Sequence, residues 1–203
     1  QGRIIHEMSQ GYPRPSLNNS RKILGFGVPP QQLGIGASFR YKDWNASFLV
    51  EGKSGAQVFS GTNVRLIGYG LHQMTVPSGG REAGFVPDGV LEDGTPITQS
   101  LDYTQQQNYW GRYNDVAEAG IYDSDYFRMR QMSVGYTFPK TMLEGTFIQS
   151  ASVSLIGKNL FFIHNSVPNV DPESAYNNSN SQGLEFAGMP VPTTVGINVN
   201  LKF

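Results

Sequence analysis

The chain has 203 residues, of which 38% are hydrophobic and 15% are charged. Its 15 basic and 16 acidic side chains nearly cancel, so it lacks the excess positive charge of a general nucleic-acid-binding protein. It contains no cysteine, which excludes disulfide bonds, cysteine zinc sites and thiol nucleophiles, and no run of 18 apolar residues that would predict a membrane-spanning helix.

Five segments alternate apolar and polar residues with the period of two that is typical of β-strands. They cover residues 33–41, 45–53, 131–138, 150–155 and 193–203. A partial strand near residues 3–8 precedes them and is followed by a segment with the composition of a loop. In the last strand Val195, Ile197 and Val199 fall on one face, whereas Asn198 falls on the other.

Short and long connections alternate along the chain. Short turns join the first strand to the second and the third to the fourth, whereas residues 55–124 and 163–189 are long connections. A barrel in an outer membrane has this arrangement, with short periplasmic turns and long external loops. A soluble antiparallel sandwich shows the same alternation. Aromatic residues at strand ends, the length of the first connection and the low charge of the polar faces favour the barrel.

The strand count indicates that the barrel is incomplete. Eight strands is the smallest usual membrane barrel, and open strand edges cannot lie in lipid because their backbone groups would be unsatisfied. The chain also opens on Gln1, Gly2 and Arg3, without an initiating Met or a signal peptide. We therefore expect it to be the C-terminal part of a larger barrel.

The first long connection contains local structure. Apolar residues recur at three- and four-residue spacing in 60–74, where Ser60 or Thr62 could cap a helix. Residues 84–96 contain two turn sequences that predict a small hairpin. Further on, Tyr109, Trp110 and Tyr113 cluster. Aromatic faces beside polar groups suit sugar or peptide ligands, although packing in a small core of the loop itself is the favoured interpretation.

Neither long connection predicts catalysis or a metal site. Asp171 and Glu173 carry the oxygen donors that calcium prefers, but two carboxylates without EF-hand spacing favour turns in a solvated loop. The three histidines lie far apart in sequence and near no nucleophile motif. We therefore expect no catalytic residue, no cofactor, no metal and no enzyme activity.

Several segments towards the carboxyl end carry recognisable motifs, beginning with residues 126–139 (YFRMRQMSVGYTFP). That segment resembles the F-x-R-L-R-x-x-x-L-G-Y-T-F-P strand of SusC/RagA-type TonB-dependent outer-membrane transporters. Residues 154–161 (SLIGKNLF) are similar to that family's G-x-N-L-F strand, and 171–173 to the D-P-E that follows. Residues 189–203 are similar to its P-x-P-R-T terminus, although the family's Arg is missing before Thr193.

The resemblance implies an all-β fold, namely the C-terminal strands of a large, 22-stranded transmembrane antiparallel β-barrel with long extracellular loops. It implies import of oligosaccharides or peptides across the bacterial outer membrane, with a SusD-like surface lipoprotein as the lid. It also implies energy from the TonB complex, delivered through an N-terminal part that these residues do not contain. Phe203, the terminal aromatic residue, would be the signal that the barrel-assembly machinery reads.

We predict the following division of the chain: extracellular loop and partial strand, 1–32; barrel hairpin, 33–54; long extracellular loop with a short helix, 55–124; barrel hairpin, 125–162; extracellular loop, 163–189; C-terminal barrel strand, 190–203. On the polar side of the wall, the residues predicted to face the lumen are Arg40, Asn45, Glu51, Asn198, Asn200 and Lys202.

Two alternatives remain open from the sequence. One is a soluble or surface-attached β-sandwich that binds glycan, which would bury Val195, Ile197 and Val199 against a second sheet of the same chain. The other, less favoured, is a passive porin or an outer-membrane enzyme. The sequence upstream of Gln1 would distinguish a passive porin or an enzyme from an active transporter.

Overall fold

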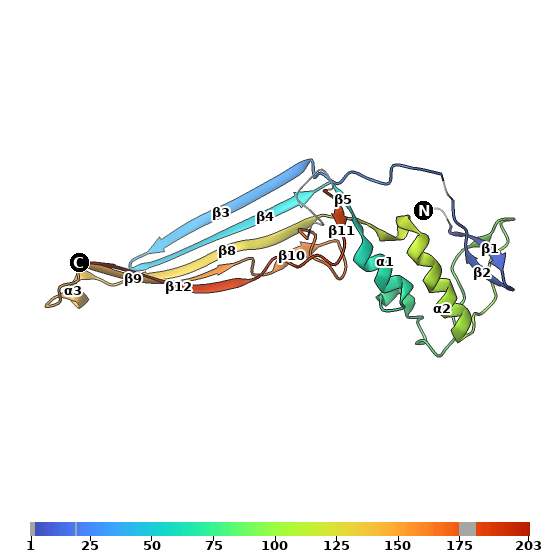
Figure 1. Ribbon diagram of the computed structural model, residues 1–203. Helices are drawn as coiled ribbons and strands as arrows, with labels where there is room; N and C mark the ends of the chain where they lie inside the picture. The colour runs from blue at the N-terminus through green and yellow to red at the C-terminus, as the bar shows by residue number, and fades with distance from the viewer. Residues whose placement is uncertain (1–2, 19, 175–181) are drawn as a thin grey trace. The chain divides into compact units, whose positions relative to one another are not determined.

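The computed structural model describes residues 3–18, 20–174 and 182–203, and the chain forms two compact units (Figure 1). The sheet unit comprises residues 26–57, 123–174 and 188–203. The loop unit comprises the described residues of 3–25, 58–122 and 182–187. Among the described residues, no helix is both long enough and apolar enough to cross a membrane.

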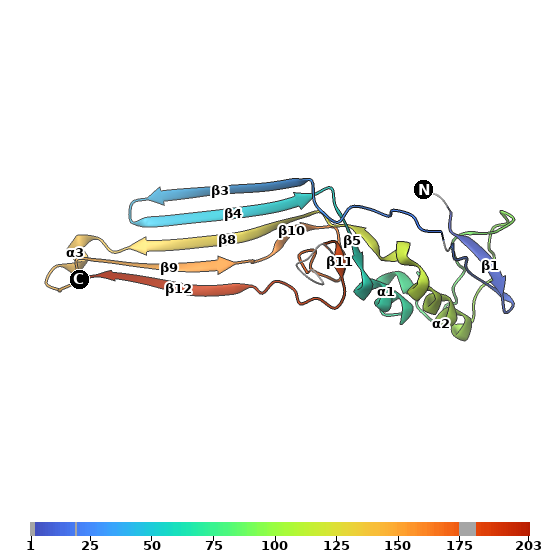
Figure 2. The same ribbon diagram turned by 45° about the horizontal axis from the view of Figure 1, so that its top comes forward.

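The sheet unit is built on one antiparallel sheet of six strands (Figure 2). Five long strands follow one another in the order β12–β9–β8–β4–β3, and the short strand β10 also pairs with β8. The strands are β3 (Gln31–Tyr41), β4 (Trp44–Ser54), β8 (Tyr126–Thr137), β9 (Ser150–Lys158), β10 (Phe162–Asn165) and β12 (Thr194–Lys202), and a short helix, α3 (Lys140–Leu143), lies between β8 and β9. The five alternating segments of the sequence are therefore strands of a single sheet.

The strand register separates an apolar face from a polar face. One transverse row of register partners consists of Phe39, Ala46, Val134, Leu155 and Ile197. The adjacent row, whose side chains point to the opposite side, consists of Arg40, Asn45, Gly135, Ser154 and Asn198. The division into two faces that the period of two predicted is therefore maintained across all five long strands.

The apolar face is exposed. Val195, Ile197 and Val199 are 64%, 73% and 58% exposed, and Phe39 and Leu155 are also exposed. This exposure contradicts the sandwich alternative, which required burial of the β12 side chains against a second sheet. Within the described part of the chain the sheet does not close on itself, because β3 and β12 each pair with one neighbour only.

A β-bulge in β8 brings two arginines to the polar face. Leu49 of β4 pairs with Gln131, whereas the next residue, Val50, pairs with Met129. Arg130 is therefore the extra residue of the bulge. Arg128 pairs with Glu51 on the polar face, and the Arg130 side chain reaches the same glutamate.

The loop unit begins with a small sheet that the sequence analysis did not predict. β1 (Ile5–Ser9) lies between β2 (Tyr12–Pro15) and β6 (Val90–Leu91), antiparallel to the first and parallel to the second. The partial strand predicted near 3–8 is therefore real, but it pairs here and not in the large sheet. A third sheet joins β11 (Leu184–Glu185), β5 (Gln57–Ser60) and β7 (Ile121–Asp123).

Two helices pack in the loop unit. α1 (Gly61–Gly68) is capped by Ser60, whose hydroxyl accepts a hydrogen bond from the Asn63 N–H. It is shorter than the predicted 60–74, because the chain turns at Gly70, which has a φ of 71°, before the short 3₁₀ turn η1 (Gln73–Thr75). α2 (Tyr103–Arg112) was not predicted.

α2 is followed by two 3₁₀ turns, η2 (Tyr113–Asp115) and η3 (Ala117–Gly120). The buried hydrophobic core of the loop unit consists of Tyr12, Ile67, Leu101, Tyr109, Trp110 and Tyr113.

Candidate functional site: an arginine cluster on the polar face

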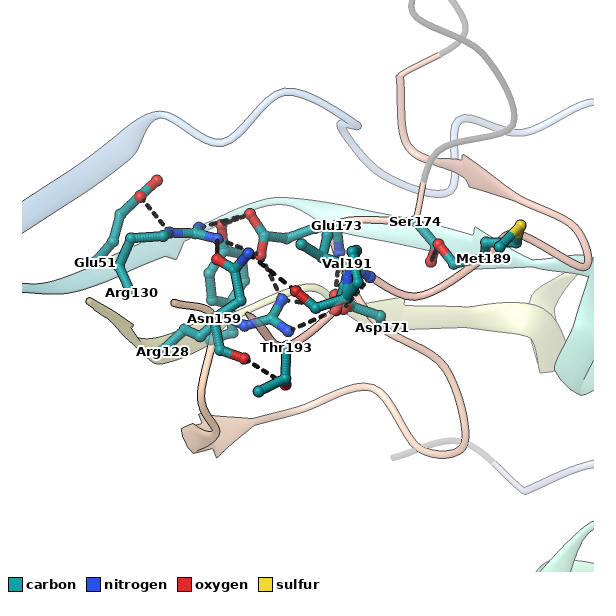
Figure 3. A network of polar contacts seen from close by, with 12 residues as sticks. Glu51, Arg128, Arg130, Asn159, Asp171, Glu173, Ser174, Met189, Val191 and Thr193 are labelled. Atoms are coloured by element: carbon teal, nitrogen blue, oxygen red, sulfur yellow. Dashed lines mark hydrogen bonds and ion pairs between the residues drawn. The ribbon is translucent and has the colours of Figure 1, made fainter. Parts of the chain in front are cut away.

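Charged side chains gather on the polar face of the sheet unit, where β8 and β4 lead into the long connections (Figure 3). We call this group the arginine cluster; its members are Glu51, Arg128, Arg130, Asn159, Asp171 and Glu173. Two guanidinium groups thus face three carboxylates. The two arginines come from one strand, whereas Asp171 and Glu173 come from the segment that follows β10 in sequence.

Glu173 joins the two arginines. Arg130 Nη2 donates to Glu173 Oε1 at 2.7 Å, and Arg128 Nη1 donates to Oε2 at the same distance. The Tyr126 hydroxyl adds a third hydrogen bond of 2.9 Å to Oε1. Burial pushes the pKa of Glu173 upward, but the hydrogen bonds from both arginines and from Tyr126 outweigh burial and hold the pKa below its ordinary value.

Asp171 and Arg128 connect the two ends of the segment between residues 171 and 191. Arg128 Nη1 donates to Asp171 Oδ2 at 3.0 Å, and the same oxygen accepts the Val191 N–H at 3.1 Å. Arg128 Nη2 in turn donates to the Val191 carbonyl at 3.3 Å. The Arg128 guanidinium also lies 4.4 Å from the centre of the Phe162 ring, in cation–π geometry.

Asn159 ties the start of β12 to the same cluster. Its backbone is left-handed, with a φ of 51°, and directly follows β9. Its side-chain carbonyl accepts from Arg130 Nη1 at 2.9 Å, and its Nδ2 donates to the Pro192 carbonyl at 3.2 Å. The Thr193 hydroxyl donates to the Asn159 carbonyl at 2.8 Å. The residues quoted from four separated motifs therefore meet in one hydrogen-bonded network.

This geometry is suited to holding chain segments in place. Five of the six guanidinium nitrogens donate to a carboxylate or carbonyl oxygen, and Arg128 Nε is buried without an acceptor among the described residues. Over the ranges that the structure describes, no group of three or more His, Asp and Glu side chains is arranged to hold a metal ion. Asp171 is 7% exposed and ion-paired, which corrects the expectation that it lies in a solvated loop.

The predicted lumen-facing residues all lie on the polar face. Arg40 and Asn45 are register partners at the hairpin end, and Glu51 belongs to the arginine cluster. On β12, Asn198, Asn200 and Lys202 are partners of three β9 serines, residues 154, 152 and 150. The structure thus brings Glu51 alone of the six into contact with the cluster. That this face lines a lumen stays a prediction.

The other predicted residues have different surroundings. Tyr109, Trp110 and Tyr113 are 2%, 7% and 5% exposed, and their rings pack edge-on or tilted against one another within the loop-unit core, which favours the packing interpretation over direct ligand contact. The ring of Phe203 stacks on that of Phe147 with centres 5.6 Å apart, and both rings are exposed. Its role as an assembly signal stays a prediction.

The sequence analysis missed the arginine cluster as a unit. Its directly bonded residues are separated by up to 79 positions, between Glu51 and Arg130, and no spacing rule joins them. One signal was available: two arginines at alternate positions of a strand require acceptors if that strand is partly buried. The nearby D-P-E segment offered two carboxylates that had no other assigned role.

Comparison with known proteins gives a consistent result. No protein-family model matches the chain. The TonB-dependent receptor P3 of Formosa agariphila is 25% identical over 189 residues, which cover 90% of this chain and 17% of the receptor. This chain therefore spans about a sixth of the length of that curated relative.

Among solved structures, the fold matches the RagAB peptide importer. The TM-score is 0.61 for its closed-closed state and 0.62 for its open-open state, each at 14% identity, and these matches cover 97% and 98% of this chain. A further structure of the RagAB peptide transporter gives 0.60 at 15% identity and covers all of this chain and 20% of that chain. At such low identity these matches show the fold alone. Together with the curated relative, they support the resemblance of this chain to the C-terminal portion of a SusC/RagA-type TonB-dependent transporter.

Proposed function

We propose that this chain forms part of the wall and an external loop region of a TonB-dependent outer-membrane importer of oligosaccharides or peptides. The observation that supports this most directly is the exposed apolar face, which crosses five strands and is opposed by a polar face. A broad exposed apolar surface marks contact with a membrane or a partner. Strands with one apolar and one polar face are the wall elements of outer-membrane barrels.

The partners follow from the same proposal. The RagAB structures are of a peptide importer named for two components, which supports a SusD-like lipoprotein as the partner of the external loops. The TonB complex would act on a part of the protein outside these 203 residues. The proposed activity is transport without covalent chemistry, which requires no catalytic group. The arginine cluster would therefore have a structural role and hold residues 171–174 and 191–193 against the wall.

The two faces can be tested by placing one charge on each. In the full-length protein, Ile197→Arg puts a cation on the apolar face, and Asn198→Arg puts it on the polar face one residue away. We expect Ile197→Arg to reduce the free energy of folding into a bilayer by about 2–4 kcal/mol at mid-depth, and Asn198→Arg to be tolerated. Folding efficiency into lipid vesicles measures both. Equal losses would contradict a lipid-facing apolar face.

Import is tested separately in cells. A strain that lacks the full-length protein should lose uptake of a particular oligosaccharide or peptide, and removal of TonB should cause the same loss. A panel of both compound classes, supplied as sole carbon or nitrogen source, identifies the class. Uptake that persists without TonB would favour a passive porin.

A further inference from the structure

A small cavity opens on the loop unit between the end of α1 and the face of α2. Its volume is about 190 Å³, and its walls include Tyr69, Arg81, Tyr103, Gln107 and Trp110. The two tyrosines are 71% and 76% exposed, so their rings stand at the cavity without being buried in the core. This cavity is distinct from the arginine cluster, because every lining residue belongs to the loop unit.

The charged group of the cavity is Arg81, which can only donate hydrogen bonds. Arg81 is fixed by a hydrogen bond from its Nη2 to the Gly70 carbonyl. Trp110 also lines the cavity, but its Nε1 is fully buried in the core and is not open to a ligand there. None of the described side chains that line the cavity is acidic, and no ion pair of Arg81 is found among the described residues. The cavity therefore favours a ligand that is anionic and rich in acceptor oxygens.

The size and the walls indicate what kind of ligand this is. Pockets for drug-sized ligands are typically about 300–1,000 Å³, so this cavity suits one unit of a longer chain. Exposed aromatic rings beside an arginine and side-chain amides suit the flat faces and hydroxyl groups of a sugar.

We propose that this cavity is a subsite for a saccharide unit that carries a carboxylate or a sulfate group. The anionic group pairs with Arg81, and the ring stacks on Tyr69 or Tyr103. This proposal rests on the proposed importer function and narrows its substrate to acidic glycans. It does not depend on which face of the sheet contacts lipid.

Binding to the full-length protein in detergent tests the subsite. The probes are an oligoglucuronate, a sulfated oligogalactoside, a neutral oligoglucoside of the same length and an oligoglutamate. We expect calorimetry to show at least tenfold tighter binding of one or both acidic saccharides than of the neutral one. Whether the carboxylated or the sulfated probe binds better identifies the anionic group. Failure of both acidic saccharides to bind overturns the proposal, as does equal binding of the neutral one.

Variants locate the binding. Arg81→Gln should weaken binding of the acidic saccharide about tenfold, to the level of the neutral probe, because a charged hydrogen bond is lost. Tyr103→Ala should weaken both saccharides. Arg21→Gln, an exposed arginine outside the cavity, is the matched control and should change affinity less than twofold. Unchanged binding in Arg81→Gln overturns the proposal, and tighter binding of oligoglutamate would assign the cavity to peptides.

The test separates this proposal from the importer function. Loss of bilayer folding in Ile197→Arg and TonB-dependent uptake do not involve the cavity. If those results hold and the acidic saccharides do not bind, only the subsite is wrong. If the saccharides bind but uptake does not require TonB, the transport mechanism is wrong and the subsite stands.

Discussion

At the arginine cluster, burial decides which ion pair matters for stability. The side chains of Arg128 and Asp171 are 5% and 4% exposed, whereas those of Arg130 and Glu51 are 20% and 35% exposed. Water cannot replace a partner that is lost from a buried pair. An exposed charge can be solvated by water instead, and such pairs contribute little. Removal of one carboxylate charge is therefore expected to cost more stability in the Arg128–Asp171 pair than in the Arg130–Glu51 pair.

Removing one carboxylate charge from each pair tests this difference. Asp171→Asn should destabilise the docking of residues 166–174 and 189–193 by about 1–3 kcal/mol, because a buried carboxylate loses its charged hydrogen bonds while Arg128 keeps its ion pair with Glu173. Glu51→Gln should cost about 0–1 kcal/mol, because its site admits water. Hydrogen exchange of the two segments in the full-length protein measures both costs. Similar exchange in the two variants would show that burial does not rank these pairs.

His6 is a buried titratable group of the loop unit. It is 0% exposed, and its Nε2 lies 3.0 Å from the Tyr109 hydroxyl. Burial lowers its pKa below the ordinary value of 6.5, and neither the Ile4 and Val90 carbonyls nor the Asp88 charge offsets that effect. Burial also lowers the pKa of His72 below its ordinary value. Both imidazoles therefore favour the neutral form in the folded loop unit.

This shift predicts a loop unit that weakens in acid. As the pH falls below about 6.5, the unfolded state takes up protons before the folded state does, so stability is complete above that pH and is lost below it. Hydrogen exchange of residues 103–113, corrected for the intrinsic rates, should show less protection at pH 5.5 than at pH 7.5. His6→Gln should reduce this difference and leave the part due to His72. Protection that is independent of pH would contradict the prediction.

Among the elements, the strands could be predicted because the physics is local. Alternate side chains point to opposite sides of any strand, so Val195, Ile197 and Asn198 could be assigned to faces without a partner strand. α2 could also have been predicted. Asp102 and Gln105 form a capping box, a recognisable signal that the analysis passed over in favour of the aromatic residues. The arginine cluster could not be predicted as a unit, because its contacts depend on the bulge at Arg130.

Close packing between β4 and β8 explains one glycine on the sheet. A Cβ built at Gly52 would lie 2.4 Å from the ring of its register partner, Phe127, and 3.1 Å from the Tyr126 carbonyl. A Cβ at Gly34 of the neighbouring strand would meet nothing within 4 Å. Gly52 therefore leaves room for the Phe127 ring, whereas Gly34 has no such constraint.

These two glycines form a matched pair for mutation. Gly52→Ala should destabilise the β4–β8 pairing by about 1–3 kcal/mol, because the Phe127 ring must leave a preferred position. Gly34→Ala should change stability by less than about 0.5 kcal/mol. Thermal unfolding of the full-length protein in detergent compares them. If Gly52→Ala were as stable as Gly34→Ala, the close approach to Phe127 would not constrain the sheet.

At the scale of the whole molecule, the sheet is incomplete by itself. Its apolar face is exposed, and in the described residues its edge strands, β3 and β12, each lack a neighbour on one side. Unpaired strand edges promote association with other strands, and a wide apolar surface promotes aggregation in water. Lipid and further strands of a longer protein would satisfy both requirements, whereas a soluble domain would have to satisfy them within the 203 residues.

Expression of residues 1–203 alone distinguishes these cases. We expect the fragment to aggregate in water and to stay dispersed only in detergent, because neither its apolar face nor its edges are covered. Threonine at Val195, Ile197 and Val199 should raise the soluble fraction, since it makes the exposed side of β12 polar. Threonine at Gly196, Asn198 and Asn200 of the same strand is the matched control and should not raise it. A soluble, monomeric fragment with cooperative unfolding would mean that the apolar face is covered by the fragment itself, which is incompatible with a lipid-facing wall.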